Sequence, residues 1–276
     1  MFELYERYVF DWKRIRCADN YHIEYAITDI CNRNCAACSH LAPLAKHNNF
    51  VNVEEFGRVI KIIRKCIPDA HTVWLTGGEP TLHPNFMELL NILRRIYPDR
   101  FVGIYSNGLT LKHYEGNKRF WEFVKNNGIV WGITTYDSDI NYLECLFSKN
   151  HCLNNLAILQ SGRLFFNLIN YSQGQPVTQE KYEKCGWERS KINIRNGKIF
   201  NCPSSEFADL FNGYFGPKLT ISPEDYLIID ENLTRAQIDN FKKPIPFCSQ
   251  CDTSQRYKKV YKNALSKRTA DEWTAL

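Results

Sequence analysis

The chain has 276 residues, of which 44% are hydrophobic and 24% are charged, and its net charge is +5. This composition is globular, excludes a disordered chain, and suits one large α/β domain with or without a small appendage. Residues 1–7 lack the apolar core of a signal peptide, and no apolar run is long enough to span a membrane, so we expect a cytoplasmic protein. The basic residues form no dense block, so we expect neither nucleic acid nor a membrane as partner.

Strands and helices are predicted to alternate along the first two thirds of the chain. Apolar residues near helical spacing predict a helical arm over 1–20. The expected strands are 21–30, 71–75, 101–105, 129–134, 155–160 and 163–168, and the expected helices are 53–66, 85–97, 118–126 and 139–149. Repeated βα units imply a parallel sheet that right-handed crossovers curl towards a barrel. Active sites of such barrels lie at the carboxyl ends of the strands.

Three cysteines, Cys31, Cys35 and Cys38, follow the first strand in one C-x3-C-x2-C loop. Eleven cysteines without a secretory signal indicate metal or redox chemistry rather than disulfides. Three thiolates can hold three irons of a [4Fe–4S] cube and leave the fourth iron open, whereas complete sites normally take four cysteines. A zinc knuckle with His40 or His47 as fourth ligand is the alternative that this loop leaves open.

The second strand is followed by Gly77, Gly78, Glu79 and Pro80. Glycines let the backbone approach a ligand without a Cβ in the way, and the carboxylate of Glu79 suits an ammonium group. Pro80 then prevents the strand from continuing. The motif stands about one βα unit after the cysteine loop, where the next strand end of a barrel belongs.

The third strand ends in Ser106 and Asn107, followed by Gly108. Ser106 and Asn107 offer a hydroxyl and an amide at a strand tip. Asn-Gly is also a common turn, so this motif gains weight only beside the first two.

A second set of cysteines comprises Cys185, Cys202, Cys248 and Cys251. Asn-Gly at 196–197, flanked by strand-forming residues, predicts a hairpin over 191–200 that brings Cys185 and Cys202 close together. Cys248 and Cys251 form a C-x2-C pair. Four thiolates complete the ligand set of a cluster or of a structural zinc ion.

The first three motifs resemble those of the radical S-adenosylmethionine (SAM) superfamily, over about residues 21 to 170. The resemblance implies a partial (β/α)6 barrel, similar to a TIM barrel, in which Cys31, Cys35 and Cys38 bind a [4Fe–4S] cluster and its open iron chelates SAM. It also implies that Gly77, Gly78 and Glu79 hold the SAM amino group and that Ser106 and Asn107 lie near its ribose and methionine. Ala37 departs from the family, which often has an aromatic residue there beside the adenine.

The second cysteine set resembles the auxiliary-cluster regions called SPASM when long and twitch when short. Because no cysteine follows Cys251, the chain resembles the one-cluster version. The resemblance implies a second [4Fe–4S] cluster held by Cys185, Cys202, Cys248 and Cys251. We therefore expect a helical arm at 1–20, a barrel at 21–175, and an auxiliary-cluster domain with a β-hairpin and a helix at 176–276.

The resemblance also implies a reaction. An electron from a flavodoxin-type or ferredoxin-type donor cleaves SAM to a 5′-deoxyadenosyl radical, which abstracts hydrogen from the substrate. An auxiliary cluster can accept the substrate's electron. The size and one-cluster layout are similar to those of the dehydrogenases of aminocyclitol pathways. The expected enzyme is therefore an oxidoreductase acting on a small sugar or cyclitol, free or nucleotide-linked.

Several alternatives stay open beside this expectation. Related short enzymes dehydrate or epimerise sugars, and other relatives modify peptides. A zinc-binding interaction module is a reading from a different class, but it gives the Gly77–Pro80 segment no role. We expect Thr134 and Tyr136, at the end of the fourth strand, to face the substrate, and no catalytic acid or base is assigned.

Overall fold

The structure is a computed structural model that describes residues 21–135, 139–160, 165–166, 169–171, 174, 176–185, 191–252, 260–261 and 264–274. Among these residues, no helix combines the length and the apolar character needed to cross a bilayer. The arm expected at 1–20 and Tyr136 lie outside the described residues.

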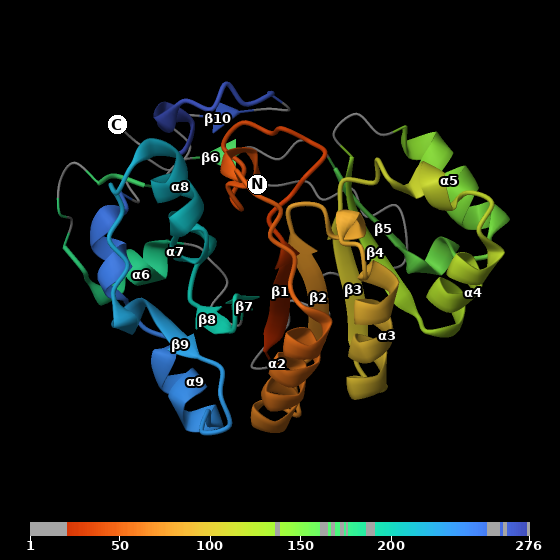
Figure 1. Ribbon diagram of the computed structural model, residues 1–276, viewed down its shortest axis with the longest axis horizontal. Coiled ribbons are helices and arrows are strands. Elements are labelled where there is room, and N and C mark those ends of the chain that lie inside the picture. Colours follow the sequence, from red (N-terminus) through yellow and green to blue (C-terminus); the bar gives the residue numbers. More distant parts are fainter. Residues whose placement is uncertain are drawn as a thin grey trace.

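Five strands and four helices alternate along the first part of the described chain (Figure 1). In chain order they are β1 His22–Thr28, α2 Val53–Cys66, β2 Thr72–Gly77, α3 Phe86–Ile96, β3 Phe101–Ser106, α4 Lys118–Asn126, β4 Ile129–Thr135, α5 Ile140–Lys149 and β5 Leu156–Gln160. All pairings among these strands are parallel. The alternation predicted from the sequence is therefore confirmed, and the helices 53–66 and 118–126 have the predicted bounds.

The remaining helices and strands lie in the second part of the chain. They are β6 Phe165–Phe166, α6 Gln179–Lys184, β7 Lys191–Arg195, β8 Lys198–Phe200, α7 Pro203–Glu206, α8 Ala208–Phe215, β9 Tyr226–Ile228, α9 Arg235–Phe241 and β10 Val260–Tyr261. The eight-stranded sheet has the order β5-β4-β3-β2-β1-β7-β8-β9. The fold is thus an open α/β sheet dominated by parallel pairs, as expected of a partial barrel.

The predicted hairpin is confirmed and joins the barrel sheet directly. β7 and β8 are antiparallel around Asn196 and Gly197, whose φ angles of 50° and 68° suit a tight hairpin turn. β7 pairs in parallel with β1, from His22↔Lys191 to Tyr25↔Ile194. The strand expected at 163–168 is described only at β6, which pairs with β10 in a separate two-stranded sheet.

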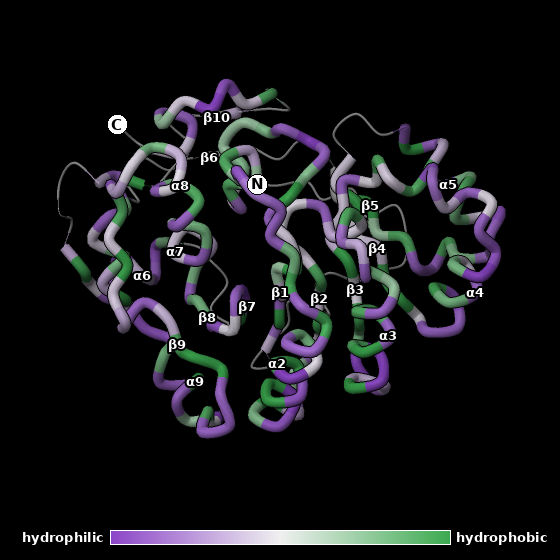
Figure 2. The backbone as a smooth tube through the Cα atoms, in the orientation of Figure 1, coloured by the Kyte–Doolittle hydropathy of each residue, from purple (hydrophilic) through white to green (hydrophobic). Residues whose placement is uncertain are grey.

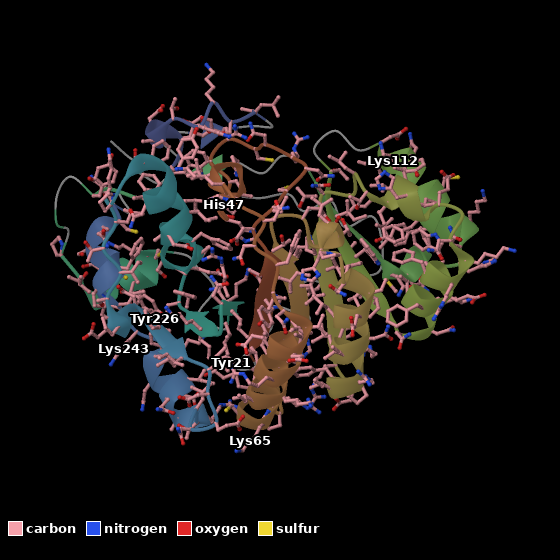
Figure 3. All side chains as sticks on the ribbon, in the orientation of Figure 1. Tyr21, His47, Lys65, Lys112, Tyr226 and Lys243 are labelled. Carbon is pink, nitrogen blue, oxygen red and sulfur yellow. The ribbon has the colours of Figure 1, made fainter. Side chains whose placement is uncertain are left out.

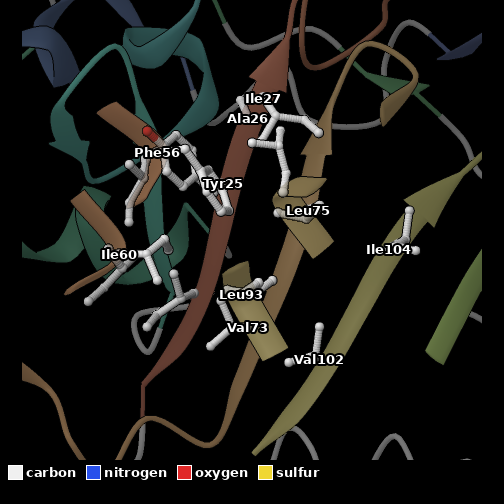
Figure 4. Close-up of a cluster of buried hydrophobic side chains, with 14 of the residues drawn as sticks. Tyr25, Ala26, Ile27, Phe56, Ile60, Val73, Leu75, Leu93, Val102 and Ile104 are labelled. Atoms are coloured by element: carbon white, nitrogen blue, oxygen red, sulfur yellow. The ribbon is translucent and has the colours of Figure 1, made fainter. Parts of the chain in front are cut away.

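The hydrophobic core lies between the sheet and its helices. Asn52 caps α2 by accepting hydrogen bonds from the Glu54 and Glu55 amides, and the helix buries Val59, Ile60, Ile62 and Ile63 as predicted. Tyr25 of β1 stacks on Phe56 of α2 at 5.0 Å (Figure 4). Figure 2 shows hydrophobic and hydrophilic residues alternating along α2 and α3, as amphipathic helices require.

The opposite face of the strands is more polar. Side chains alternate along a strand, so Ile23, Tyr25 and Ile27 face the helices while His22, Glu24 and Thr28 face the other side. Glu24 accepts hydrogen bonds from Lys191 at 2.6 Å and from the His22 ring at 3.0 Å. Burial alone would raise the pKa of Glu24, but these two groups hold it below its ordinary value. The inner face therefore carries buried, paired charges.

Candidate functional site

The three barrel motifs meet at the carboxyl edge of the sheet. In Figure 3, Tyr21, which precedes β1, lies in the lower half of the view, whereas His47 and Lys112, which follow β1 and β3, lie higher, in the direction in which β1, β2 and β3 run. The backbone of the Gly77–Glu79 segment crosses onto β1 and the loop after it. The Gly78 amide donates to the Thr28 carbonyl at 2.7 Å, and the Glu79 amide donates to the Ile30 carbonyl at 2.6 Å.

Gly77 and Gly78 are required by this close crossing. A Cβ on Gly77, whose φ is +125°, would lie 2.1 Å from the Thr28 oxygen. A Cβ on Gly78 would lie 2.0 Å from the Ile30 oxygen. Because real Cβ atoms do not approach backbone oxygens this closely, only glycine allows β2 to reach the cysteine loop.

The carboxylate of Glu79 is fully buried and joins two motifs. Its Oε1 accepts from the Ser106 hydroxyl at 2.9 Å and from the Thr81 hydroxyl at 2.6 Å, and its Oε2 accepts from the Asn107 amide at 2.8 Å. Burial raises the pKa of Glu79, and these hydrogen bonds oppose that rise. Glu79 therefore fixes the strand-end turn at Ser106 and Asn107.

The side-chain amide of Asn107 completes the connection to the cysteine loop. Its Nδ2 donates to Asn32 Oδ1 at 2.8 Å and lies 3.6 Å from Cys31 Sγ. Burial first, and the charges of Cys38, Glu79 and Cys35 second, raise the pKa of Cys31 to about 12. The pKa of Cys38 is raised to about 11 by burial and by Cys35. The three thiols are thus neighbours that interact electrostatically, with Cys35 buried and Cys31 and Cys38 partly exposed.

His40 lies between this edge and the C-terminal elements. Its Nδ1 bonds to the carbonyl oxygen of Gly77 and therefore carries the proton. Its ring packs against Phe207 at 5.0 Å. Burial lowers the pKa of His40, which keeps the ring neutral. Neither His40 nor His47 belongs to a metal-binding group among the described residues.

The four C-terminal cysteines are also brought together. Burial, followed by the charges of Cys185 and Cys248, raises the pKa of Cys202 to about 12. The pKa of Cys251 is raised well above its ordinary value by burial and by Cys202, Cys185 and Cys248. Cys248 lies beside Lys181, whose Nζ donates to the Cys248 carbonyl at 2.6 Å. Cys185 and Cys202, which flank the hairpin, thus lie near the C-x2-C pair of Cys248 and Cys251.

The described cysteines are all free thiols. No group of three or more His, Cys, Asp or Glu side chains in the described ranges is arranged to hold a metal ion. The ligand role of both sets rests on their number, spacing and proximity. Of the remaining cysteines, Cys66 and Cys152 are buried and Cys145 is exposed, while Cys17 lies outside the described residues.

A buried ion network beside the cysteine loop was not predicted from the sequence. Arg195 of β7 forms paired hydrogen bonds with Asp29 at 2.9 and 2.8 Å and with Asp209 at 2.8 and 2.9 Å. Asp29 and Arg195 are each about 3% exposed. Burial alone would lower the pKa of Arg195, but the two carboxylates raise it. The network attaches the end of β1 to α8.

Replacing Glu79 with Gln tests the buried carboxylate. We expect Glu79→Gln to lower the free energy of unfolding by about 1–3 kcal/mol, because an amide NH2 at Oε2 would face the Asn107 N–H and leave a buried donor unpaired. Urea unfolding of the protein measures this. Glu88→Gln on α3 is the control, since Glu88 is exposed and should change stability by less than about 0.5 kcal/mol. Equal stability of the two variants would contradict this role of Glu79.

The part of the chain that carries the three barrel motifs is similar to known proteins. Residues 25–144 match the family model described as the radical SAM superfamily. The GTP 3′,8-cyclase of Vibrio vulnificus (strain YJ016) is 27% identical over 120 residues, which cover 42% of this chain and 34% of that protein. The GTP 3′,8-cyclase of Klebsiella pneumoniae subsp. pneumoniae is 34% identical over 94 residues, covering 33% of this chain and 28% of that protein. The match thus spans about a third of the length of these curated relatives.

One solved structure resembles the chain along most of its length. The crystal structure of BtrN in complex with AdoMet and 2-DOIA aligns with 90% of this chain and 99% of its own, at a TM-score of 0.53 and 15% sequence identity. This likeness shows a shared fold. The family match covers β1 to α5, including the cysteine loop and the motifs at the ends of β2 and β3. The match to the radical SAM superfamily therefore covers residues 25–144, which carry all three motifs.

Proposed function

We propose that this protein is a radical SAM enzyme that oxidises a small polar substrate with the help of two [4Fe–4S] clusters. One observation carries the proposal: Asn107 bonds at once to Asn32 of the cysteine loop and, through its backbone amide, to Glu79. Three motifs that lie far apart in the sequence thereby form one hydrogen-bonded edge. Such an edge at the carboxyl ends of parallel strands is where barrel enzymes bind their ligands.

The first cysteine set suits the cluster that the family implies. Cys31, Cys35 and Cys38 are three thiols from one loop, close enough to perturb one another's pKa. Three thiolates match a cube with one iron left for an exogenous ligand. When bound, the cluster and SAM supply one-electron cleavage of the SAM sulfonium–carbon bond and thereby hydrogen-atom abstraction.

We propose that the Gly77–Glu79 segment and the turn at Ser106 and Asn107 bind SAM. The two glycines let the backbone of this segment lie against the start of the cysteine loop. A carboxylate has about four acceptor positions, two on each oxygen, and Oε2 of Glu79 accepts only from the Asn107 amide among the described residues. This leaves Oε2 one acceptor position for the SAM ammonium group. Ser106 and Asn107 would then act chiefly by orienting Glu79 and the cysteine loop.

The second cysteine set supports an auxiliary cluster of the twitch type. Cys185, Cys202, Cys248 and Cys251 supply four thiols in mutual electrostatic range, which is the number that a complete [4Fe–4S] site takes. We propose residues 21–175 as the barrel and 176–276 as the auxiliary domain. Four thiolates also suit structural zinc, so metal analysis distinguishes the two.

We infer a small polar substrate, such as a sugar or cyclitol, from the fold neighbour and the sequence relatives. The polar side chains of His22, Glu24 and Lys191 on the inner face bond to one another near the amino ends of β1 and β7, so they are not proposed as substrate ligands. The fold neighbour was solved with AdoMet and 2-DOIA and the sequence relatives are named as acting on GTP, so both a free and a nucleotide-linked small molecule deserve testing.

The proposal is tested by reductive SAM cleavage. The anaerobically reconstituted protein, given dithionite and SAM, should form 5′-deoxyadenosine, and the rate should rise when a substrate from a sugar or cyclitol panel is added. The Cys31/Cys35/Cys38→Ala variant should form none. A wild-type protein that binds zinc, lacks iron and leaves SAM intact would overturn the proposal in favour of a zinc-binding module.

A further inference from the structure

The C-terminal segment 264–274, here called the C-terminal clasp, lies across the cysteine loop. Cys35 and Leu265 form an antiparallel β-bridge. Three hydrogen bonds join the segments, namely Ala36 N to Ala264 O at 2.9 Å, Ser266 N to Asn34 O at 2.8 Å, and Asn34 Nδ2 to Ser266 O at 2.9 Å. The backbone of the loop thus uses partners that come from the other end of the chain.

Trp273 anchors the clasp against the last ligand of the loop. Its indole is 3% exposed, and Nε1 donates to the Cys38 carbonyl at 3.0 Å. Thr269 and Glu272 form a capping box that shapes the turn just before Trp273. Arg268 adds a second contact by donating from Nε to the Pro43 carbonyl at 2.9 Å. The clasp therefore contacts the loop at its middle, at its end, and just beyond it.

The clasp also reaches the second cysteine set. Thr274 forms a parallel bridge with Ile169, and Ile169 forms an antiparallel bridge with Cys251. The Asn170 amide donates to the Gln250 carbonyl at 2.7 Å beside that bridge. A continuous series of contacts therefore runs from Cys38 through the Trp273 side chain and the backbone of Thr274 and Ile169 to Cys251.

We propose that the C-terminal clasp holds the Cys31–Cys38 loop in its ligand-binding shape, with Trp273 as the positioning residue. Backbone groups in a loop need hydrogen-bond partners, and the clasp supplies them to Asn34, Ala36 and Cys38. The part of this inference that concerns cluster binding rests on the proposed function. The part that concerns loop order does not.

Hydrogen exchange in the metal-free protein tests the clasp directly. In Trp273→Phe the ring stays but the bond to Cys38 is lost, so we expect amides of residues 31–38 to exchange about fivefold faster. Trp121→Phe is the matched control. Trp121 of α4 is 2% exposed, and its indole donates the same kind of hydrogen bond, to the Tyr114 carbonyl at 2.9 Å. This control should leave exchange over 31–38 unchanged. Equal exchange over 31–38 in the two variants would overturn the proposal.

A second variant keeps the test decisive if Trp273→Phe does not fold. Asn34→Ala removes only the side-chain bond to Ser266 and should also speed exchange over 31–38. Leu265→Ala is its control, since this side chain is 66% exposed and its removal leaves the backbone pairing intact. Unchanged exchange in Asn34→Ala, relative to Leu265→Ala, would reject the clasp.

A cluster readout extends the test to the reconstituted protein. Under a chelator, iron bound by Cys31, Cys35 and Cys38 should be lost several-fold faster from Trp273→Phe than from Trp121→Phe, with a changed electron paramagnetic resonance signal on adding SAM. Equal iron loss would overturn the positioning role. If the wild-type protein binds no iron, the proposed function fails, and the exchange experiment alone still decides whether the clasp orders the loop.

Discussion

Gly78→Ala is expected to disrupt the site strongly, although it adds only one methyl group. The new Cβ would lie 2.0 Å from the Ile30 oxygen and 2.3 Å from the Ile30 carbonyl carbon. Either β2 or the cysteine loop must move, and the bond from the Glu79 amide to Ile30 would break. We expect a loss of about 1–3 kcal/mol in the free energy of unfolding. Because a shift of about 1 Å can cost about 100-fold in rate, SAM cleavage should fall by about that factor.

Two measurements on Gly78→Ala separate these effects. Urea unfolding of the metal-free protein reports the steric cost, and 5′-deoxyadenosine formation by the reconstituted protein reports the site. The control is Gly116→Ala, where a Cβ would have no atom within 4 Å. A Gly78→Ala protein with the stability and activity of Gly116→Ala would show that the close crossing of β2 over the loop does not exist.

Arg195→Met is expected to cause the largest loss of stability among the polar substitutions. The change leaves Asp29, which is 3% exposed, as a buried carboxylate without its cation. Removing one partner of a buried ion pair typically costs about 3–5 kcal/mol, whereas exposed pairs contribute about 0.2–1 kcal/mol. Thermal and urea unfolding measure the loss. Arg58→Met is the control, because the side chains of Arg58 and Glu55 are 42% and 39% exposed.

A double variant checks that the loss comes from the uncompensated charge. Asp29→Asn combined with Arg195→Met should cost clearly less than the sum of the two single changes, because neither partner is then left charged and alone. Strict additivity would contradict a direct interaction between Asp29 and Arg195. The network matters for the site because Asp29 stands two residues before Cys31.

The sequence predicted the elements that depend on local patterns. The helix at 53–66 follows from its apolar spacing, and the Asn196–Gly197 hairpin follows from the turn that these two residues favour. The strand ends that carry Gly77 and Asn107 were predicted because apolar runs stop just before them. The first cysteine set was grouped by its spacing, and the second was grouped by the predicted hairpin and the C-x2-C pair.

The contacts between distant segments could not be predicted in this way. Arg195 and Asp29 are 166 residues apart, and Trp273 and Cys38 are 235 residues apart. Their pairing depends on β7 lying beside β1 and on the C-terminal segment returning across the cysteine loop. No local pattern encodes either arrangement. The hydrogen bonds of Glu79 with Ser106 and Asn107 could not be predicted either, because they depend on β3 lying beside β2.

Iron content after anaerobic reconstitution tests the central claim of two clusters most directly. The wild-type chain should hold about eight irons, and the Cys31/Cys35/Cys38→Ala variant about four, held by Cys185, Cys202, Cys248 and Cys251. A fall from about four irons to none, with zinc at the C-terminal cysteines, would contradict the auxiliary cluster and the oxidative reaction that depends on it.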